Sequence, residues 1–304
     1  FVNTVETEIG PGLTLPAAAL NAMRRQGLEA LDEARGAVPF WAPGEYSPAL
    51  AYHRRRPGPS PLWARFFRAA QICETDSLER VILPLGEITL ALMEALGDKL
   101  AGELPAVCFP EDEGALEARV RALQDGGLRE LWTENIYGIA LARRLGMRVR
   151  GGFGLNIANS RAAEFYEARG LESLTVSCEL PMSGVKTLGG AIPRGIAVYG
   201  RLPLMRFRNC PLRANIGCAY CGGGGELTDR KGVPFPVECG SRRFASLLNS
   251  VPLDIAGRDD PADFRLLWFT REEAGECAGV IGRFRRDERT DAPHTGGLYY
   301  RKLR

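Results

Sequence analysis

The chain has 304 residues, of which 45% are hydrophobic and 25% charged, and its formal net charge is +2. This length allows one large hydrophobic core and a small appendage, and the near-neutral charge gives no global indication of nucleic-acid binding. No segment approaches the roughly 18 continuous apolar residues that span a bilayer, and no N-terminal stretch resembles a signal peptide. The chain has 8 cysteines, a number typical of a reducing compartment when most stand singly. We therefore expect a cytoplasmic protein.

The first part of the chain is predicted to be a helix followed by a linker. Residues 15–35 carry apolar side chains at helical spacing after a Gly-Pro-Gly turn. Residues 36–62 are rich in proline and glycine, which is typical of a linker. Because the chain opens with Phe1 rather than Met, we expect residues 1–62 to be the end of a preceding domain and residues 63–304 to be the main domain.

In residues 63–304, short apolar runs alternate with amphipathic stretches. The apolar runs, predicted as strands, lie near 65–70, 81–85, 106–109, 131–133, 149–153, 174–177, 196–199 and 266–269. The amphipathic stretches, predicted as helices, are 87–100, 113–123, 136–145, 160–169 and 271–284. This alternation indicates βαβ units, and eight strands in about 240 residues match a (β/α)8 TIM-like barrel of the α/β class. A doubly wound open sheet is the alternative, although no glycine-rich phosphate loop follows the first strand.

Four cysteines in the last third of the chain, Cys210, Cys218, Cys221 and Cys239, form the pattern C-x7-C-x2-C-x17-C. Soft metals bind deprotonated sulfur, so four thiolates can complete a zinc site or hold an iron–sulfur cluster. One C-x2-C knuckle with two outlying cysteines favours a 4Fe-4S cluster, because a zinc ribbon normally pairs two knuckles. Zinc is the alternative metal, and four free thiols buried as small hydrophobes are a further alternative.

In a barrel, the cysteine segment 203–256 is an insertion between strands seven and eight, at the C-terminal mouth where barrel enzymes keep their active sites. We predict that Asn156, Glu179 and Arg206 are catalytic residues that orient an anionic substrate, and that Asn135 and Tyr199 contact the substrate. Glu134 and Asn159 follow strands at the same mouth. The ordinary interpretation is that each asparagine caps a helix and each glutamate opens a first turn.

The order of motifs over residues 150–300 resembles the C-terminal catalytic region of peptidase family U32. The motifs are LNIANSRAAEFY, TVSCELPMSGVKTL, YGRLPLMRFRNCPLR, the C-x2-C knuckle, LTDRKGVPFPVEC, LLNSVPLDI, RLLWFTREE and TGGLYYRKLR. Residues 1–35 resemble the junction that follows the accessory domain of long family members. The four cysteines match the family's cluster ligands, Glu179 matches the Glu of its Ser-Pro-Glu-Leu motif, and Asn249 matches the Asn of its Asn-Ser-x-Pro-Leu motif and becomes a predicted substrate contact. Cys178 stands where proline is usual.

The resemblance implies an oxygen-sensitive 4Fe-4S cluster and oxygen-independent hydroxylation of tRNA, ribosomal RNA or the ubiquinone ring. It also implies prephenate as a co-substrate in the RNA-modifying branch, and we allow for a partner subunit. The family was named for collagenase-like peptidases, but the chain has only 2 histidines, His53 and His294, and no H-E-x-x-H motif. A protease site is hard to build from these residues.

We therefore predict an iron–sulfur protein that supports hydroxylation of RNA (tRNA or 23S rRNA) or of a small aromatic substrate. A hydroxylase-type enzyme is favoured over a peptidase on the residues present. The alternatives are a U32 collagenase-like peptidase and a zinc-binding structural or RNA-binding module.

Overall fold

The computed structural model describes residues 6, 8, 10–12, 14–37, 59–219, 221, 223–240 and 244–300. The chain divides into two compact units, residues 1–49 and residues 50–304. In the first unit, helix α1 (Ala17–Gly36) confirms the predicted opening helix, and none of its side chains is buried. Most of the predicted linker lies outside the described residues, and the predicted domain boundary at residue 62 stays a prediction.

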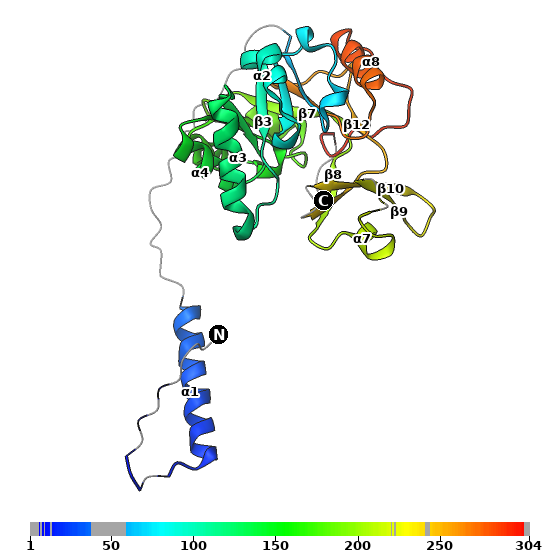
Figure 1. The fold of residues 1–304 in the computed structure, drawn as a ribbon. Coiled ribbons are helices and arrows are strands. Elements are labelled where there is room, and N and C mark those ends of the chain that lie inside the picture. The colour runs from blue at the N-terminus through cyan, green and yellow to red at the C-terminus, as the bar shows by residue number, and fades with distance from the viewer. Residues whose placement is uncertain are drawn as a thin grey trace. The chain divides into compact units, whose positions relative to one another are not determined.

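Eight parallel strands close into a barrel in the second unit (Figure 1). They are β1 (Leu62–Arg65), β2 (Arg80–Pro84), β3 (Leu100–Glu103), β4 (Glu130–Thr133), β5 (Arg148–Gly151), β6 (Leu171–Thr175), β7 (Arg194–Gly200) and β13 (Phe264–Trp268). Consecutive strands pair in parallel from β1 to β7, and β13 closes the ring by pairing in parallel with both β7 and β1. The predicted (β/α)8 barrel is confirmed.

Helices connect most of these strands. They are α2 (Leu90–Leu96), α3 (Glu113–Asp125), α4 (Ile136–Leu145), α5 (Ser160–Glu167), α6 (Met182–Thr187) and α8 (Ala274–Arg285). Short 3-10 helices lie at Ala69–Gln71, Thr75–Ser77, Leu85–Glu87, Gly97–Lys99, Pro110–Asp112 and Phe153–Leu155. The bounds of α4 match the predicted helix 136–145. No helix in the described ranges is long and apolar enough to cross a membrane.

The predicted third strand, 106–109, is wrong. The helix before it ends early, because Gly97 caps α2 with a positive φ of 51°. The chain then enters strand β3 at Leu100, so residues 106–109 form part of the loop above the barrel mouth. The first strand also lies earlier than predicted: β1 ends at Arg65, where the prediction began. Both shifts matter for the site, because they place Arg65 and Glu103 at strand ends.

An antiparallel sheet occupies the connection between β7 and β13, where a barrel ordinarily has a helix. Its strands are β8 (Pro203–Phe207), β9 (Gly224–Thr228), β10 (Pro234–Gly240) and β11 (Phe244–Leu248), in the order β8-β11-β10-β9, and helix α7 (Pro211–Asn215) follows β8. Strand β12 (Leu253–Asp254) then pairs with β7. We call residues 203–248 the cysteine sheet. It has its own small core of Leu212, Val237 and Ala245, so it packs as a separate layer beside the barrel.

A buried charge cluster lies at the end of the barrel where the strands begin, opposite to the mouth. Its centre is Glu130, the first residue of β4. The Glu130 side chain is fully buried, and its Oε1 lies 3.1 Å from Nε of Arg80 and 2.7 Å from Nε of Arg150. Both guanidiniums also lie over the ring of Trp63, at 5.9 and 5.1 Å from its centroid. One carboxylate therefore compensates two largely buried arginines at this end.

Replacing Glu130 with Gln should destabilise the barrel by about 3 kcal/mol, because it leaves two arginines without a buried counter-charge. The loss is measured as a lower midpoint of urea unfolding. The matched control is Glu164→Gln, which removes the exposed Glu164–Arg161 pair and should leave the midpoint within error of the parent. Equal midpoints for the two variants would contradict this role of Glu130.

Candidate metal centre and mouth cavity

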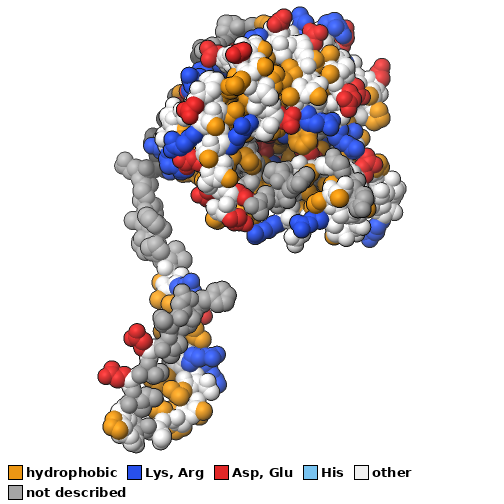
Figure 2. Space-filling model, viewed as in Figure 1, with side chains coloured by type: hydrophobic (Ala, Val, Ile, Leu, Met, Phe, Trp, Pro, Cys, Tyr) orange, Lys and Arg blue, Asp and Glu red, His pale blue; other side chains and the backbone are white. Residues whose placement is uncertain are grey.

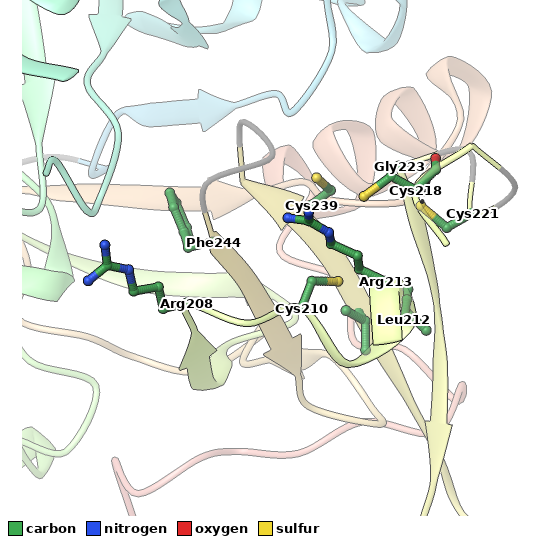
Figure 3. Close-up of a pocket in the computed structure, with 10 residues that line it drawn as sticks. Arg208, Cys210, Leu212, Arg213, Cys218, Cys221, Gly223, Cys239 and Phe244 are labelled. Atoms are coloured by element: carbon green, nitrogen blue, oxygen red, sulfur yellow. Dashed lines mark hydrogen bonds between the residues drawn. The ribbon is translucent and has the colours of Figure 1, made fainter. Parts of the chain in front are cut away.

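The four patterned cysteines line one small pocket in the cysteine sheet. Cys210 precedes α7, directly after β8, while Cys218 and Cys221 lie in the loop between α7 and β9. Cys239 lies on β10, paired with Ala245 of β11. Because β8 and β10 are both neighbours of β11, segments far apart in the sequence reach the same place. Figure 3 shows the four side chains together, with Arg213 extending among them. We call this the cysteine pocket.

The donors of the cysteine pocket fit a thiolate-bound metal centre. Its lining includes Arg208 and Arg213 but no carboxylate or imidazole of the described residues, so sulfur is the ligand type it offers. The two arginines can offset the negative charge of four thiolates. In this conformation the pocket is only about 20 Å³, and no group of three or more Cys, His, Asp or Glu side chains in the described part is arranged to hold a metal ion. Gly217 and Gly223, on either side of the C-x2-C knuckle, both have positive φ.

A much larger cavity of about 840 Å³ lies between the barrel mouth and the cysteine sheet. Its barrel side is formed at the ends of β1, β3, β4 and β13, and its other side by β8, β10 and β11. Figure 2 shows Lys and Arg side chains on the barrel near its border with the sheet. We call this the mouth cavity. It shares Cys221, Gly223, Val237, Cys239 and Phe244 with the cysteine pocket, so a metal held by the cysteines would lie at its wall.

Two ion pairs cross the inner part of the mouth cavity. Arg65 is 4% exposed; its Nε lies 2.9 Å from Oε2 of Glu103, and its Nη1 donates to the carbonyl of Phe269 at 3.0 Å. Arg206 of β8 donates to Oε2 of Glu134 at 2.5 Å, which ties the cysteine sheet to the end of β4. Burial raises the pKa of Glu103, although the charge of Arg65 acts against that rise.

Glu238 adds a third carboxyl to this inner part. Burial raises its pKa to about 7, with Arg65 acting in the opposite direction. Its Oε1 is buried and has no hydrogen-bond partner among the described residues, and the same holds for Oε1 of Glu134. Buried carboxyl oxygens without partners are costly in a folded protein. Both oxygens lie below the surface of the cavity wall, so the wall carries this cost itself and neither oxygen is exposed to a ligand in this conformation.

Of the predicted site residues outside the cysteines, Arg206 lines the mouth cavity, as does Glu134. Because Glu134 already neutralises Arg206, this arginine attracts an anionic substrate less strongly than the sequence suggested. The side chains of Asn135 and Asn159 act as helix caps: each Oδ1 accepts a backbone N–H, from Tyr137 and from Ala162, at 2.9 Å. For these two residues the ordinary capping interpretation is confirmed.

Asn156 and Glu179 are exposed and do not line the mouth cavity. Asn156 has a positive φ of 54°, and its Oδ1 accepts a hydrogen bond of 2.5 Å from the hydroxyl of Ser177. That hydroxyl in turn accepts the backbone N–H of Glu179 at 3.2 Å. Asn156 thus holds the turn after β6 that carries Glu179. Their catalytic roles stay predictions.

Tyr199 and Asn249 lie away from the mouth cavity. The Tyr199 ring packs against Phe269 and Phe284, and its hydroxyl donates to Glu272 at 3.2 Å. Burial raises its pKa. Asn249 follows β11 and pairs through its backbone with Leu202 and Arg201, so it helps to close the base of the cysteine sheet. Their predicted substrate contacts remain predictions.

Cys178, the departure from the family motif, lines neither cavity. Burial raises its pKa to about 12, so it stays a protonated thiol at neutral pH.

Sequence reasoning missed Arg65, Glu103 and Glu238. Arg65 and Glu103 are the last residues of β1 and β3, and correct strand bounds would have placed both at the mouth. Glu238 precedes Cys239 on β10, and successive side chains of a strand point to opposite faces. A strand assignment for 234–240 would therefore have indicated a carboxylate on the face opposite to the cysteine.

No protein-family model matches this sequence, and no curated protein matches it. Two solved structures are similar in fold. One is the structure of the U32 peptidase Mk0906, with a TM-score of 0.45, 13% identity, and coverage of 77% of this chain and 99% of that chain. The other is the native KDPGal structure, with a TM-score of 0.31, 20% identity, and coverage of 47% of this chain and 75% of that chain.

The contacts of Asn156 generate a test that separates a structural from a catalytic role. Asn156→Ala should destabilise the protein by about 2 kcal/mol, since it loses the Ser177 hydrogen bond and strains an αL backbone. Asn156→Gly should recover about half of that loss, because glycine adopts positive φ freely. Urea unfolding measures both. Unchanged stability in both variants, together with lost activity, would contradict the structural role and favour the catalytic one.

Proposed function

We propose that this chain is an iron–sulfur protein of peptidase family U32 that supports hydroxylation of RNA or of a small aromatic substrate. The observation that carries the proposal is the shared wall of the cysteine pocket and the mouth cavity, formed by Cys221, Cys239 and their neighbours. A redox centre is useful where it adjoins the substrate, and the mouth of a (β/α)8 barrel is where substrates bind. The motif order over residues 150–300 supports the family and the reaction class.

Each part of the site has a role in this proposal. Cys210, Cys218, Cys221 and Cys239 would hold a 4Fe-4S cluster, which supplies electron transfer when bound. Arg208 and Arg213, which line the same pocket, would offset the negative charge of the cluster and its thiolates. The mouth cavity would hold the substrate, and the resemblance implies prephenate as a co-substrate in the RNA-modifying branch. Zinc in place of iron, and a purely structural site, are the outcomes that the experiments below distinguish.

Protein purified without oxygen should be brown and contain about four irons and about four sulfides per chain. Cys210→Ala and Cys221→Ala should each lose most of this iron, because each removes a thiolate ligand. The control is Cys108→Ala, a half-buried cysteine that lines neither cavity, which should keep its iron. A colourless parent protein with one zinc per chain would overturn the iron–sulfur assignment.

The reaction is tested by mass spectrometry of tRNA and ribosomal RNA from cells that lack the protein. A hydroxylated nucleoside should disappear, return with the parent gene, and stay absent with Cys221→Ala. Cleavage of gelatin by the purified parent, retained in Cys210→Ala and Cys221→Ala, would instead support the peptidase alternative. Intact modification of every RNA in the deletion strain would exclude the RNA branch of the proposal.

A further inference from the structure

The two faces of the cysteine sheet differ in composition. The strand register places Arg206, Ser246 and Glu238 in one row on the face that lines the mouth cavity. The opposite face, which we call the outer face, carries Cys239 and a set of apolar side chains: Met205, Phe207, Leu227, Phe235, Val237 and Leu247. Figure 1 shows α7 on this side of the sheet, away from the barrel.

The described residues cover the outer face only in part. Helix α7 has 5 residues and packs over the middle of the face, where a Cβ at Gly225 would meet Leu212 at 2.8 Å. Met205 is 56% exposed, and Ile216, which follows α7, is 51% exposed. Four more apolar side chains of the face are half-buried: Phe207, Leu227, Phe235 and Leu247. Apolar residues grouped on one exposed face are typical of an interaction surface.

The cysteine sheet is basic, although the chain as a whole is nearly neutral. Residues 203–248 contain seven basic and three acidic residues, a net charge of +4, whereas the whole chain has +2. Arg213 is exposed on α7, and Arg230 and Lys231 are exposed in the turn between β9 and β10. A second copy of this chain would bring the same positive charge to the outer face. Charge complementarity therefore favours an acidic partner.

The cysteine pocket lies on the outer face and close to the surface. Cys239 and Val237 line the pocket and belong to the apolar row of that face, and Cys218 is exposed. A cluster that transfers electrons in turnover has to receive them from a donor. A donor on the outer face would reach the cysteine pocket without entering the mouth cavity, which lies on the other side of the sheet.

We infer that the outer face docks an acidic one-electron donor protein, with the apolar residues at the centre of the contact and Arg213, Arg230 and Lys231 around it. The inference rests on the proposed function and adds the source of its electrons. An apolar centre with a polar rim is the usual anatomy of a protein interface, whereas a nucleic-acid backbone is bound by basic and polar side chains. Electron-transfer contacts are small and weak, and charge steers them.

The electron transfer balances with a flavin as the donor. One electron leaves the anionic flavin hydroquinone, which becomes the neutral semiquinone. The same electron reduces the 4Fe-4S cluster from the 2+ to the 1+ state, and no proton moves.

The test uses the full chain purified without oxygen and flavodoxin, an acidic protein whose flavin exchanges single electrons. Oxidised flavodoxin should bind the parent in titration calorimetry at low salt, and the affinity should fall as salt is added. Arg230→Glu/Lys231→Glu and Met205→Glu should each weaken binding about tenfold, because each brings negative charge to an acidic partner. Flavodoxin hydroquinone should reduce the cluster of the parent faster than that of either variant, as followed by the semiquinone absorbance in stopped flow.

The matched control is Arg121→Glu/Arg286→Glu, which makes the same change in net charge at two exposed arginines of the barrel helices. The control should bind flavodoxin within about twofold of the parent. The methyl viologen radical, a small cation that needs no docking surface, should reduce the clusters of the parent and all variants alike. Equal losses in the two double variants, or a parent that does not bind flavodoxin, would overturn the inference.

Titration of the same proteins with tRNA identifies the other occupant of a basic face. A parent that binds tRNA but not flavodoxin, with the tRNA affinity lost in Arg230→Glu/Lys231→Glu, would make the outer face an RNA surface and overturn the inference.

Iron content and RNA modification are measured on the same proteins, which separates this inference from the proposed function. Intact iron and modification without flavodoxin binding overturns the inference alone. The expected binding pattern in a protein without iron supports the docking surface and overturns the iron–sulfur function.

Discussion

Parallel closure of the barrel is the constraint on which the rest of this structure depends. Eight strands that run in one direction bring all their carboxyl ends to one end of the barrel, its mouth. Arg65, Glu103 and Glu134 therefore meet there although they are the ends of, or follow, three different strands. The connection from β7 to β13 starts at this mouth. The cysteine sheet, which stands in that connection where a barrel ordinarily has a helix, therefore lies at the mouth (Figure 1). The Arg206–Glu134 pair joins that sheet to the barrel.

This arrangement explains how cysteines on a separate layer can serve a site in the barrel. The cysteine sheet has a small hydrophobic core that is separate from the core of the barrel. One face of the sheet carries the cysteine pocket, while residues at the edge of that pocket also line the mouth cavity. In the proposed function, the metal ligands would lie on the sheet and the substrate contacts on the barrel, and the two groups would share one wall. The ion pairs Arg65–Glu103 and Arg206–Glu134 are largely buried, and electrostatic interactions are stronger there than in water.

The sequence predicted the barrel well and most of the mouth poorly. The four patterned cysteines do line one pocket, and their role as metal ligands stays a prediction. The period of the apolar residues located α4 correctly. The cysteine pattern is visible in the sequence without any assignment of strand bounds. The third strand was misplaced because its apolar residues are few and Gly97 ends the preceding helix early. With β1 and β3 shifted, Arg65 and Glu103 could not be assigned to the mouth. The capping of α4 by Asn135 and α5 by Asn159 shows why polar residues after strands are weak evidence of a site: the following helix needs them.

The central claim is that a redox-active cluster on the four cysteines adjoins the ligand in the mouth cavity. Electron paramagnetic resonance of the dithionite-reduced protein, recorded with and without an excess of tRNA or ribosomal RNA from cells that lack the protein, tests it most directly. The account predicts the signal of a reduced 4Fe-4S cluster whose g-values or relaxation change when the RNA is bound. A reduced protein that contains zinc and gives no signal, or a cluster signal that saturating RNA leaves unaltered, would contradict it.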